Sequence, residues 1–368
     1  MSHPRTAHYP HHEDYVRLAN SFRPFVMFTH EPHYRSASVN TDKFGLREHY
    51  DADGRFVDLE TAREDYSACN VVVGGSTVFG VDATDDRLTL ANHLNQPGVP
   101  CVNFGIRGAI SHQELQAFQL LRRFLPPVSN VVVMTGVNLA SMAALDDTVF
   151  YPEYGGIFSE PWHYDAFCDQ YRNLTYSNQR RERRTALGIV DRWFQDSRWG
   201  RIIARWLVNR EPPQSPPEVR AAIPFETKLA LLESQFENDL AVWSALQSAW
   251  GVRVHLVLQP AAGWTRKKLA PIESKCISAD RRSVPSIDRY AHREFFEPYR
   301  ERIVAAARRY GLAFHDANTW FDDAGAGEEL FTDICHLTDR GNQLLAAELR
   351  RNLVWKEASH DRRIDQAA

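Results

Sequence analysis

The segment Val71-Val72-Val73-Gly74-Gly75-Ser76-Thr77 decides the fold of this chain. Its three consecutive valines predict a short strand that is buried in a parallel sheet. Two glycines end the run, and a glycine turn after a buried strand can expose the next side chain and bring backbone N–H groups near it. Ser76 is therefore a candidate nucleophile at the carboxyl end of this strand.

Two further strands are predicted later in the chain, and segments of helical character separate the strands from one another. Short apolar runs at residues 99–104 and 131–134 end in Gly105 and in Thr135-Gly136. Such runs, each ended by a turn residue, again predict buried strands. Ligands bind beyond the carboxyl ends of parallel strands, so we expect the residues after each strand to meet at one edge of the sheet.

Predicted helices connect these strands and continue after them. Residues 84–94 and 111–125 carry apolar residues at helical spacing, and the second helix opens with the capping-box pattern Ser111-His112-Gln113-Glu114. The later helices and strands are predicted at 229–246, 252–258, 296–310, 312–314 and 339–353. Strands that alternate with helices predict an α/β protein with three layers, α/β/α, around a parallel sheet.

The chain divides by composition into a core, an arm, an insertion and a tail. We expect an arm packed on the core at 1–69, a core formed by 70–138 and 224–355, and a tail at 356–368. The histidines of the arm (His3, His8, His11 and His12) are expected to be solvated rather than to bind metal.

Residues 139–223 are predicted to form a helical, basic insertion or cap. Its arginines are Arg180, Arg181, Arg183, Arg184, Arg192, Arg198, Arg201, Arg205 and Arg210. Such a cap can pack its apolar face on the core and leave the arginines in solvent. Alternatively, the arginines form a docking face for an acidic partner: an acyl carrier protein, coenzyme A or an anionic membrane surface.

Bulk composition excludes several classes of protein. The chain has 368 residues, is 43% hydrophobic and carries a formal net charge of −4, so no basic excess points to nucleic acid. No stretch has the length and apolarity of a membrane helix, and no signal peptide is expected. Five scattered cysteines fit a reducing compartment, so we expect a cytoplasmic protein without metal or cofactor.

A second motif, Asp333-Ile334-Cys335-His336, precedes the last predicted helix. A carboxylate here can accept a hydrogen bond from the histidine Nδ1–H, fix its tautomer and stabilise the imidazolium. With Ser76, the pair Asp333 and His336 suggests the triad of a serine hydrolase or acyltransferase. The plainer alternatives are a simple turn at Ser76, a structural role for His336 and a helix N-cap at Asp333 or Thr338.

Two residues that follow the other strands are candidates for binding an oxyanion. The side-chain amide of Asn138 can donate a hydrogen bond, and Gly108 allows close approach of its backbone N–H. A turn asparagine and an ordinary loop glycine are the alternatives. Gly105 competes with Gly108, but its position in the chain favours Gly108.

In this order, the motifs resemble those of the SGNH (GDSL-like) hydrolase superfamily. Ser76, Gly108, Asn138 and the pair Asp333 and His336 match its four blocks, and the resemblance covers residues 70–138 and 252–350. It implies a three-layer α/β/α (SGNH/flavodoxin-like) fold, a Ser-His-Asp triad, and an oxyanion hole made by the backbone N–H groups of Ser76 and Gly108 and the Asn138 side chain.

The chain departs from the family's pattern at two positions. Gly75 stands where the first block usually has Asp, and Leu139 stands where the third block usually has Asp after its Asn. Neither of the missing residues belongs to the triad, so the departures concern the pocket more than the chemistry.

The function predicted from the sequence is an esterase or thioesterase that works through an acyl-Ser76 intermediate. The first alternative is an acyltransferase in the biosynthesis of a specialised metabolite or a glycan, which would use the same site. The second alternative is a non-catalytic binding or regulatory protein on the same scaffold.

Overall fold

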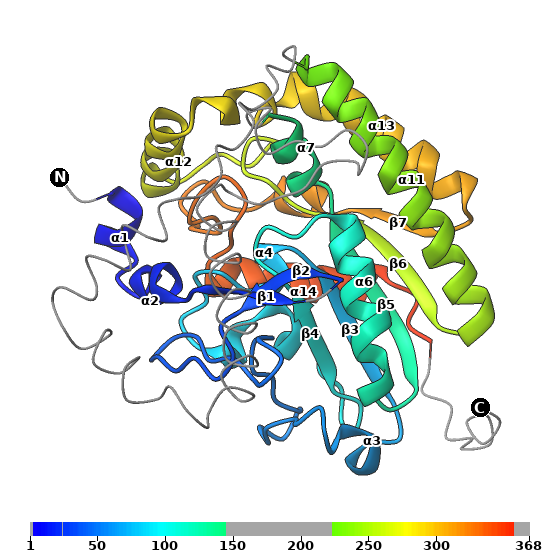
Figure 1. Cartoon of the computed structure of the whole chain (residues 1–368). Helices are drawn as coiled ribbons and strands as arrows, with labels where there is room; N and C mark the ends of the chain where they lie inside the picture. Colours follow the sequence, from blue (N-terminus) through cyan, green and yellow to red (C-terminus); the bar gives the residue numbers. More distant parts are fainter. Residues whose placement is uncertain (1–2, 24, 145–222, 357–368) are drawn as a thin grey trace, which may run out of the picture. The chain divides into compact units, whose positions relative to one another are not determined.

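A parallel sheet of five strands forms the centre of the computed structural model (Figure 1). Its strands, in the order in which they lie side by side, are β4 (Cys101–Gly105), β3 (Cys69–Gly74), β5 (Val128–Thr135), β6 (Arg253–Leu258) and β7 (Ala313–Asp316). Every neighbouring pair is parallel. The predicted α/β class with a parallel sheet is confirmed, and β3 contains the valine run that predicted it.

The structure describes residues 3–23, 25–144 and 223–356. Nearly all of the predicted basic insertion, including its arginines and the docking face proposed for them, lies outside the described residues, as does the tail after Lys356. The acyl carrier protein, the coenzyme A and the membrane surface therefore stay predictions. Among the described helices, none is long and apolar enough to cross a membrane.

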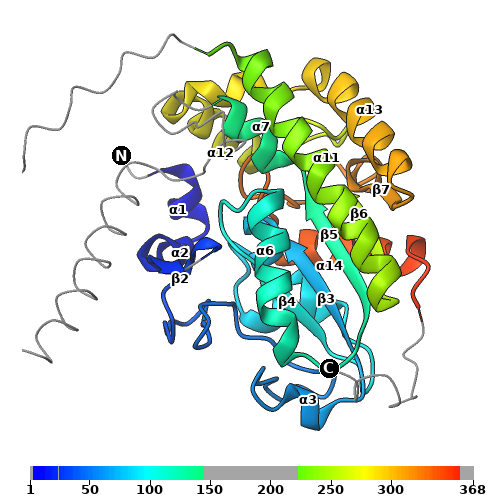
Figure 2. The same ribbon diagram turned by 45° about the vertical axis from the view of Figure 1, so that its right-hand side comes forward.

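Helices cover both faces of the sheet and complete the three layers (Figures 1 and 2). On one face lie α6 (Ser111–Leu121), α11 (Phe225–Trp250) and α13 (Arg293–Arg309); on the other lie α5 (Leu90–His93) and α14 (Asp339–Asn352). On the α14 face, Val72 and Val132 belong to the same buried cluster as Leu345. On the opposite face, the rings of Phe118 and Trp243 lie 5.1 Å apart and join α6 to α11.

Most of the remaining elements are short, although one helix among them has 13 residues. They are the helices α1 (Pro4–His8), α2 (His12–Arg17), α3 (Ala62–Asp65), α4 (Ser76–Phe79), α7 (Val137–Ala144) and α12 (Pro271–Ser283), and the hairpin β1 (Asn20–Arg23) and β2 (Met27–His30). Single 3-10 turns occur at Asp86–Leu88, Arg122–Phe124, Pro285–Arg289 and Ala317–Phe321. Among the helices, α4 follows β3 and α7 follows β5, so both begin at the carboxyl edge of the sheet.

Two local predictions were wrong because polar side chains compete for the backbone. The helix expected at 84–94 is broken into Asp86–Leu88 and α5, since the Asp85 carboxylate accepts from Arg87 N–H and Thr89 is extended. The capping box expected from Ser111 does not form, because Ser111 is already the first residue of α6 and an isoleucine side chain cannot accept a hydrogen bond. Ile110 is the N-cap, and its backbone N–H donates to Gln113 Oε1 at 3.1 Å. Ser111 instead donates its hydroxyl to Asp239 at 2.6 Å.

The N-terminal segment is anchored to the core by a buried arginine. Arg47 is fully buried and donates to the Asp86 carboxylate at 2.8 Å, and to Gly80 O and Ser38 O at 2.6 Å each. It also donates to the Tyr15 hydroxyl at 2.6 Å. A buried guanidinium without such acceptors would be very costly, so these contacts fix the path of the segment against the loop that follows α4.

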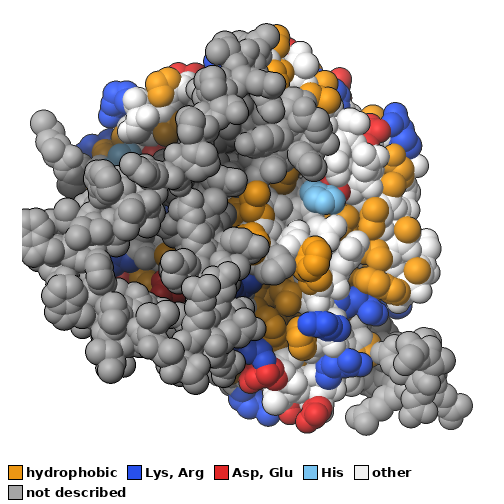
Figure 3. Space-filling view, viewed as in Figure 1, with side chains coloured by type: hydrophobic (Ala, Val, Ile, Leu, Met, Phe, Trp, Pro, Cys, Tyr) orange, Lys and Arg blue, Asp and Glu red, His pale blue; other side chains and the backbone are white. Residues whose placement is uncertain are grey.

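The outer surface of the helical layer is of mixed character. In Figure 3, hydrophobic side chains alternate with Lys and Arg over the face that carries α6 and α11. Leu120, Val242 and Trp250 are each 37% exposed, and the Arg122 guanidinium lies 3.9 Å from the centre of the Trp250 ring. Partly exposed apolar residues of this kind are normal on a solvent-facing helix layer.

Acid should weaken the fold through His49, whose imidazole is almost completely buried. Burial lowers the pKa of His49 from 6.5 to about 4. The folded protein thus binds this proton less readily than the unfolded chain, and the contribution to stability is complete above pH 6.5 and lost as the pH falls toward 4. We expect the thermal midpoint to fall more steeply from pH 7 to pH 5 in the wild type than in His49→Gln. If the thermal midpoints of the two proteins, compared after subtracting their difference at pH 8, changed equally with pH, His49 would not be the cause of the acid sensitivity.

Candidate active site

Ser76 lies directly after β3, as the first residue of α4. Gly75 precedes it in an extended conformation, and Gly80, with φ of +83°, ends the short helix after one turn. The Ser76 hydroxyl is half-buried and lies 2.7 Å from Nε2 of His336, which comes from a loop 260 residues later in the chain. The turn therefore presents this hydroxyl directly to an imidazole.

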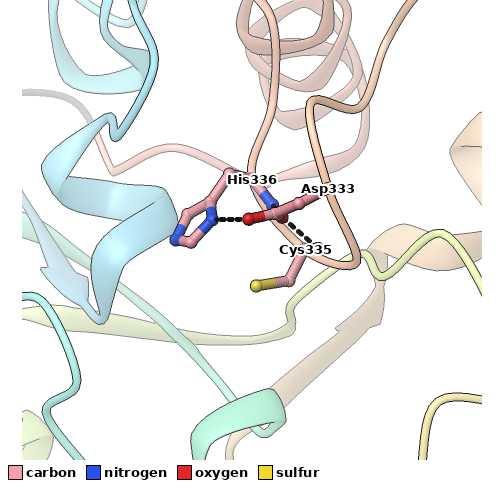
Figure 4. A group of neighbouring side chains, drawn as sticks. All are labelled: Asp333, Cys335 and His336. Carbon is pink, nitrogen blue, oxygen red and sulfur yellow. Dashed lines mark hydrogen bonds and ion pairs between the residues drawn. The ribbon is translucent and has the colours of Figure 1, made fainter. Parts of the chain in front are cut away.

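His336 is oriented by Asp333, as Figure 4 shows. Nδ1 of His336 lies 2.5 Å from Oδ2 of Asp333, and Oδ1 of the same carboxylate accepts from the backbone N–H groups of Cys335 at 2.8 Å and His336 at 2.7 Å. A proton on Nδ1 that is donated to Asp333 leaves Nε2 free to accept the Ser76 proton. Thr338 caps α14 through Gly341 N–H, so Asp333 is not the N-cap of that helix.

Asp333 stays ionised although it is buried. Burial alone would raise its pKa, but the Arg5 guanidinium, His336 and the Cys335 N–H outweigh burial and hold the pKa of Asp333 well below its usual range. A permanent negative charge beside His336 is what a serine-activating imidazole needs when it becomes positively charged.

Cys335 adjoins this pair but contributes its backbone rather than its thiol. Burial raises the pKa of the Cys335 thiol well above its usual value, and in Figure 4 the side chain points away from the line between imidazole and carboxylate. Potential metal-ligand atoms of Asp333, Cys335 and His336 lie within 4.8 Å of one another. The Asp333 and His336 atoms, however, already bond to each other, so the trio is part of the hydrogen-bonded line that reaches Ser76.

Thr77 and Gln259 tie the serine turn to the histidine loop. The Thr77 hydroxyl donates to Cys335 O at 2.9 Å, and Gln259 at the end of β6 donates to Thr77 Oγ1 at 2.6 Å. All three groups are buried. They hold the loop of His336 at a fixed distance from Ser76, a role that no sequence pattern indicates.

The structure also brings both candidate oxyanion donors to the serine turn. Gly108 has φ of +76° in a tight turn closed by a hydrogen bond from Ala109 N–H to Ile106 O at 3.1 Å. Asn138, in the first turn of α7, donates from Nδ2 to Ala109 O at 2.6 Å. An amide nitrogen carries two hydrogens, so the second remains available for a ligand.

Gly75 and Gly105 owe their identity to close packing. A Cβ on Gly75 would lie 2.5 Å from Nδ2 of Asn138, so the Asn138 amide occupies the space that a side chain at position 75 would need. A Cβ on Gly105 would collide with the backbone of Phe79. Gly105 therefore allows α4 to pack on β4, and Gly108 is left as the second-block candidate. Leu139, the other departure, is buried.

The loop of Gly108 is held by the N-terminal segment. Arg107 N–H donates to Nε2 of His30 at 3.1 Å, and the Arg107 guanidinium donates to the carbonyls of Tyr15 at 2.6 Å and Leu18 at 2.5 Å. His30 lies 2.8 Å from Gly45 O through Nδ1. Burial and the Arg107 charge hold the pKa of His30 well below its usual value, so the neutral ring can donate from Nδ1 and accept at Nε2.

The expectation of solvated N-terminal histidines was wrong for part of the arm. Nδ1 of His12 lies 2.6 Å from the buried Asp82 carboxylate, and Nε2 of His11 lies 2.9 Å from Asp82 O. Arg5 is also buried and contacts both Asp82 and Asp333. These contacts could not be predicted, because a short polar segment carries no periodic pattern that shows what it will bury.

Comparison with known proteins gives structural neighbours but no sequence relative. No family model matches the chain, and no curated protein matches it. A lipolytic protein of the G-D-S-L family from Desulfitobacterium hafniense aligns with 77% of this chain and 99% of its own, at 11% identity and a TM-score of 0.39. A member of the same family from Veillonella parvula aligns with 78% of this chain and 98% of its own, at 13% identity and a TM-score of 0.37.

An acetylxylan esterase from Geobacillus stearothermophilus aligns with 81% of this chain and all of its own, at 12% identity and a TM-score of 0.35. All three TM-scores lie below 0.5, so the functional assignment depends on the residues of this chain and not on these likenesses. The residues that match the four SGNH blocks, Ser76, Gly108, Asn138 and the pair Asp333 and His336, lie together beside the carboxyl edge of a parallel sheet with helices on both faces. In both respects the chain has an SGNH hydrolase-like fold.

Proposed function

We propose that this protein is a serine hydrolase of the SGNH type, which cleaves an acyl ester or thioester through an acyl-serine intermediate. The observation that carries the proposal is the unbroken line from Ser76 Oγ through both ring nitrogens of His336 to Asp333, with separations of 2.7 Å and 2.5 Å. These distances are within hydrogen-bond reach for nucleophile, base and orienting group.

The proposed reaction has two halves. Ser76 Oγ attacks the acyl carbonyl while His336 Nε2 takes the hydroxyl proton, and the same proton then passes to the leaving alcohol or thiol as the carbon–oxygen or carbon–sulfur bond breaks. In the second half, His336 removes a proton from water, the hydroxide attacks the acyl-serine, and the proton returns to Ser76 Oγ as the acid is released. Asp333 stays ionised and stabilises the imidazolium in both halves.

The oxyanion of each tetrahedral intermediate is proposed to lie between the backbone N–H groups of Ser76 and Gly108 and the Asn138 amide. Support comes from the short distance between Asn138 and the Gly108 turn, and from the missing side chain at Gly75 that makes room for the amide. Donors held before the reaction begins are effective because they need no reorganisation as charge develops.

The nucleophile is tested by intact-protein mass after reaction with a fluorophosphonate probe. We expect a single adduct on the wild type and none on Ser76→Ala, because the probe reacts with an activated serine. The matched control is Ser278→Ala, which removes an exposed serine of α12 and should leave labelling unchanged. An adduct that persists on Ser76→Ala, or a folded wild type that stays unlabelled, would refute the proposal.

Turnover of acyl esters and acyl thioesters tests the hydrolytic step. Ser76→Ala and His336→Ala should each lower kcat by a factor on the order of 10⁶, as removal of a single triad member can. Product analysis with and without an added alcohol acceptor shows whether water resolves the acyl-enzyme. An acyl-alcohol product formed in preference to free acid would replace the hydrolase with an acyltransferase.

The donor role of Asn138 is tested indirectly at Gly75. Gly75→Ala should displace the amide and lower kcat by about 10²–10³-fold, the usual cost of one oxyanion donor. Gly325→Ala is the control, because a Cβ at Gly325 would meet nothing within 4 Å. Equal activities of the two variants at equal thermal stability would show that Asn138 is not a donor.

A further inference from the structure

Arg5 joins the catalytic carboxylate to a second buried carboxylate. The guanidinium donates from Nη1 to Oδ2 of Asp333 and from Nε to Oδ2 of Asp82 at 2.7 Å, and its Nη2 forms an ion pair with the same Asp82 oxygen at 2.5 Å. The side chains of Arg5, Asp82 and Asp333 are 9%, 0% and 6% exposed. Buried charge-assisted hydrogen bonds of this kind are the strong ones, and a forked guanidinium can serve two carboxylates at once.

Asp82 is itself firmly held. Its Oδ2 accepts from the Thr332 hydroxyl at 2.5 Å and its Oδ1 lies 2.6 Å from His12 Nδ1. Thr332 directly precedes Asp333. The Asp82 carboxylate therefore bonds both to the residue before Asp333 and to Arg5, the cation that pairs with Asp333. Asp82 has φ of +69°, an uncommon conformation for a residue with a side chain, although Asp tolerates it better than most.

The charges along this line alternate. The order is negative at Asp82, positive at Arg5, negative at Asp333 and, during the proposed reaction, positive at His336. Arg5 Nη2 lies 3.1 Å from His336 Nδ1, so an unbalanced guanidinium there would oppose the imidazolium. Asp82 supplies the balancing charge. Without Arg5, by contrast, the carboxylates of Asp82 and Asp333 would share a buried site with no cation between them, which opposes ionisation of both.

A third carboxylate, that of Asp280, adds negative charge near Arg5. Asp280 of α12 interacts electrostatically with Arg5, Asp82 and Asp333, and burial, with Asp333 next, raises the pKa of Asp280 to about 7. His3 Nε2 lies 3.3 Å from Asp280 Oδ1. Arg5 is thus the cation that lies between Asp82 and Asp333, and Asp280 adds a third acid to its electrostatic surroundings.

We propose that Arg5 and Asp82 are positioning residues of the active site: Arg5 holds Asp333 in line with His336, and Asp82 balances the charge of Arg5. The inference rests on the proposed function of Ser76, Asp333 and His336, and extends the triad to a chain of five residues. Neither Arg5 nor Asp82 bonds to Ser76 or exchanges a proton in the reaction.

A double-mutant cycle tests this role in the full-length protein. We expect Arg5→Gln and Asp82→Asn each to lower the rate of fluorophosphonate labelling and the kcat for ester hydrolysis on the order of 10²-fold, the cost of a misplacement of about 1 Å. KM should change little, because neither residue is proposed to touch substrate. If Asp82 acts through Arg5, removing it once Arg5 is gone should cost little more, so we expect the double variant to react about as slowly as Arg5→Gln, and not with the product of the two losses.

Two further variants separate positioning from folding. Arg17→Gln removes an exposed arginine of the same N-terminal segment, which pairs with Glu13 at 2.9 Å, and should leave labelling at the wild-type rate. Arg5→Lys retains the buried charge, so it keeps the test open if Arg5→Gln does not fold. We expect it to fold and still react slowly, because an ammonium group cannot reproduce the planar fork.

The outcomes distinguish this inference from the proposed function. An unlabelled wild type would end the proposed function and the inference with it. A labelled wild type, with Arg5→Gln or Arg5→Lys reacting at the wild-type rate, would overturn the inference alone. So would a double variant whose loss is the product of the two single losses, because two independent structural roles predict losses that accumulate and follow the thermal midpoint.

Discussion

The site depends on how closely the backbone after β3 approaches its neighbours. A Cβ on Gly74 would collide with the carbonyl oxygen of Met134, one on Gly75 would meet the Asn138 amide, and one on Gly105 would strike the backbone of Phe79. Since none of the three carries a side chain, the loops that follow β3, β4 and β5 can lie very close to one another. Every other feature of the candidate site, including the separation of Ser76 from His336, builds on this approach.

A set of arginines then fixes the surroundings of that volume. Arg47 anchors the N-terminal segment beside α4, Arg107 binds the same segment to the Gly108 loop, and Arg5 bonds to the Asp333 carboxylate. Buried ion pairs are weak evidence for stability, because desolvation offsets much of their attraction. Their clearer effect here is to fix positions, because the planar guanidinium can donate hydrogen bonds to its partners only in a narrow range of directions.

Much of the fold and the core of the candidate site can be predicted from local patterns in the sequence. The valine run of β3 and the strand ended by Gly105 carry strong signals, because buried parallel strands have few alternatives. Ser76, Asp333 and His336 stood out because each lies at the end of a strand or the start of a helix, where side chains become available to a ligand. Their meeting within hydrogen-bond distance required the parallel order of the strands, which the alternation of strands and helices predicts.

Other features could not be predicted, for physical reasons. The helix expected at 84–94 failed where Asp85 bonded locally to the backbone, a competition that helical spacing does not reveal. Arg5, Asp82, Thr77 and Gln259 become meaningful only through partners that are far away in the chain. The prediction that His12 is solvated was wrong, because its contact with the buried Asp82 carboxylate offsets the cost of burying the imidazole.

The contact between Arg5 and Asp333, which spans 328 positions of the chain, has a consequence for how the protein matures. During synthesis, Ser76 is made before His336, so in the proposed mechanism the serine lacks its base until that later part of the chain exists. Closing so long a loop costs little more entropy than closing one of half its length, since the cost grows only with the logarithm of loop length. In the proposed mechanism, Ser76 can therefore become reactive only after residue 336 has been synthesised, and closing the long loop costs little additional entropy.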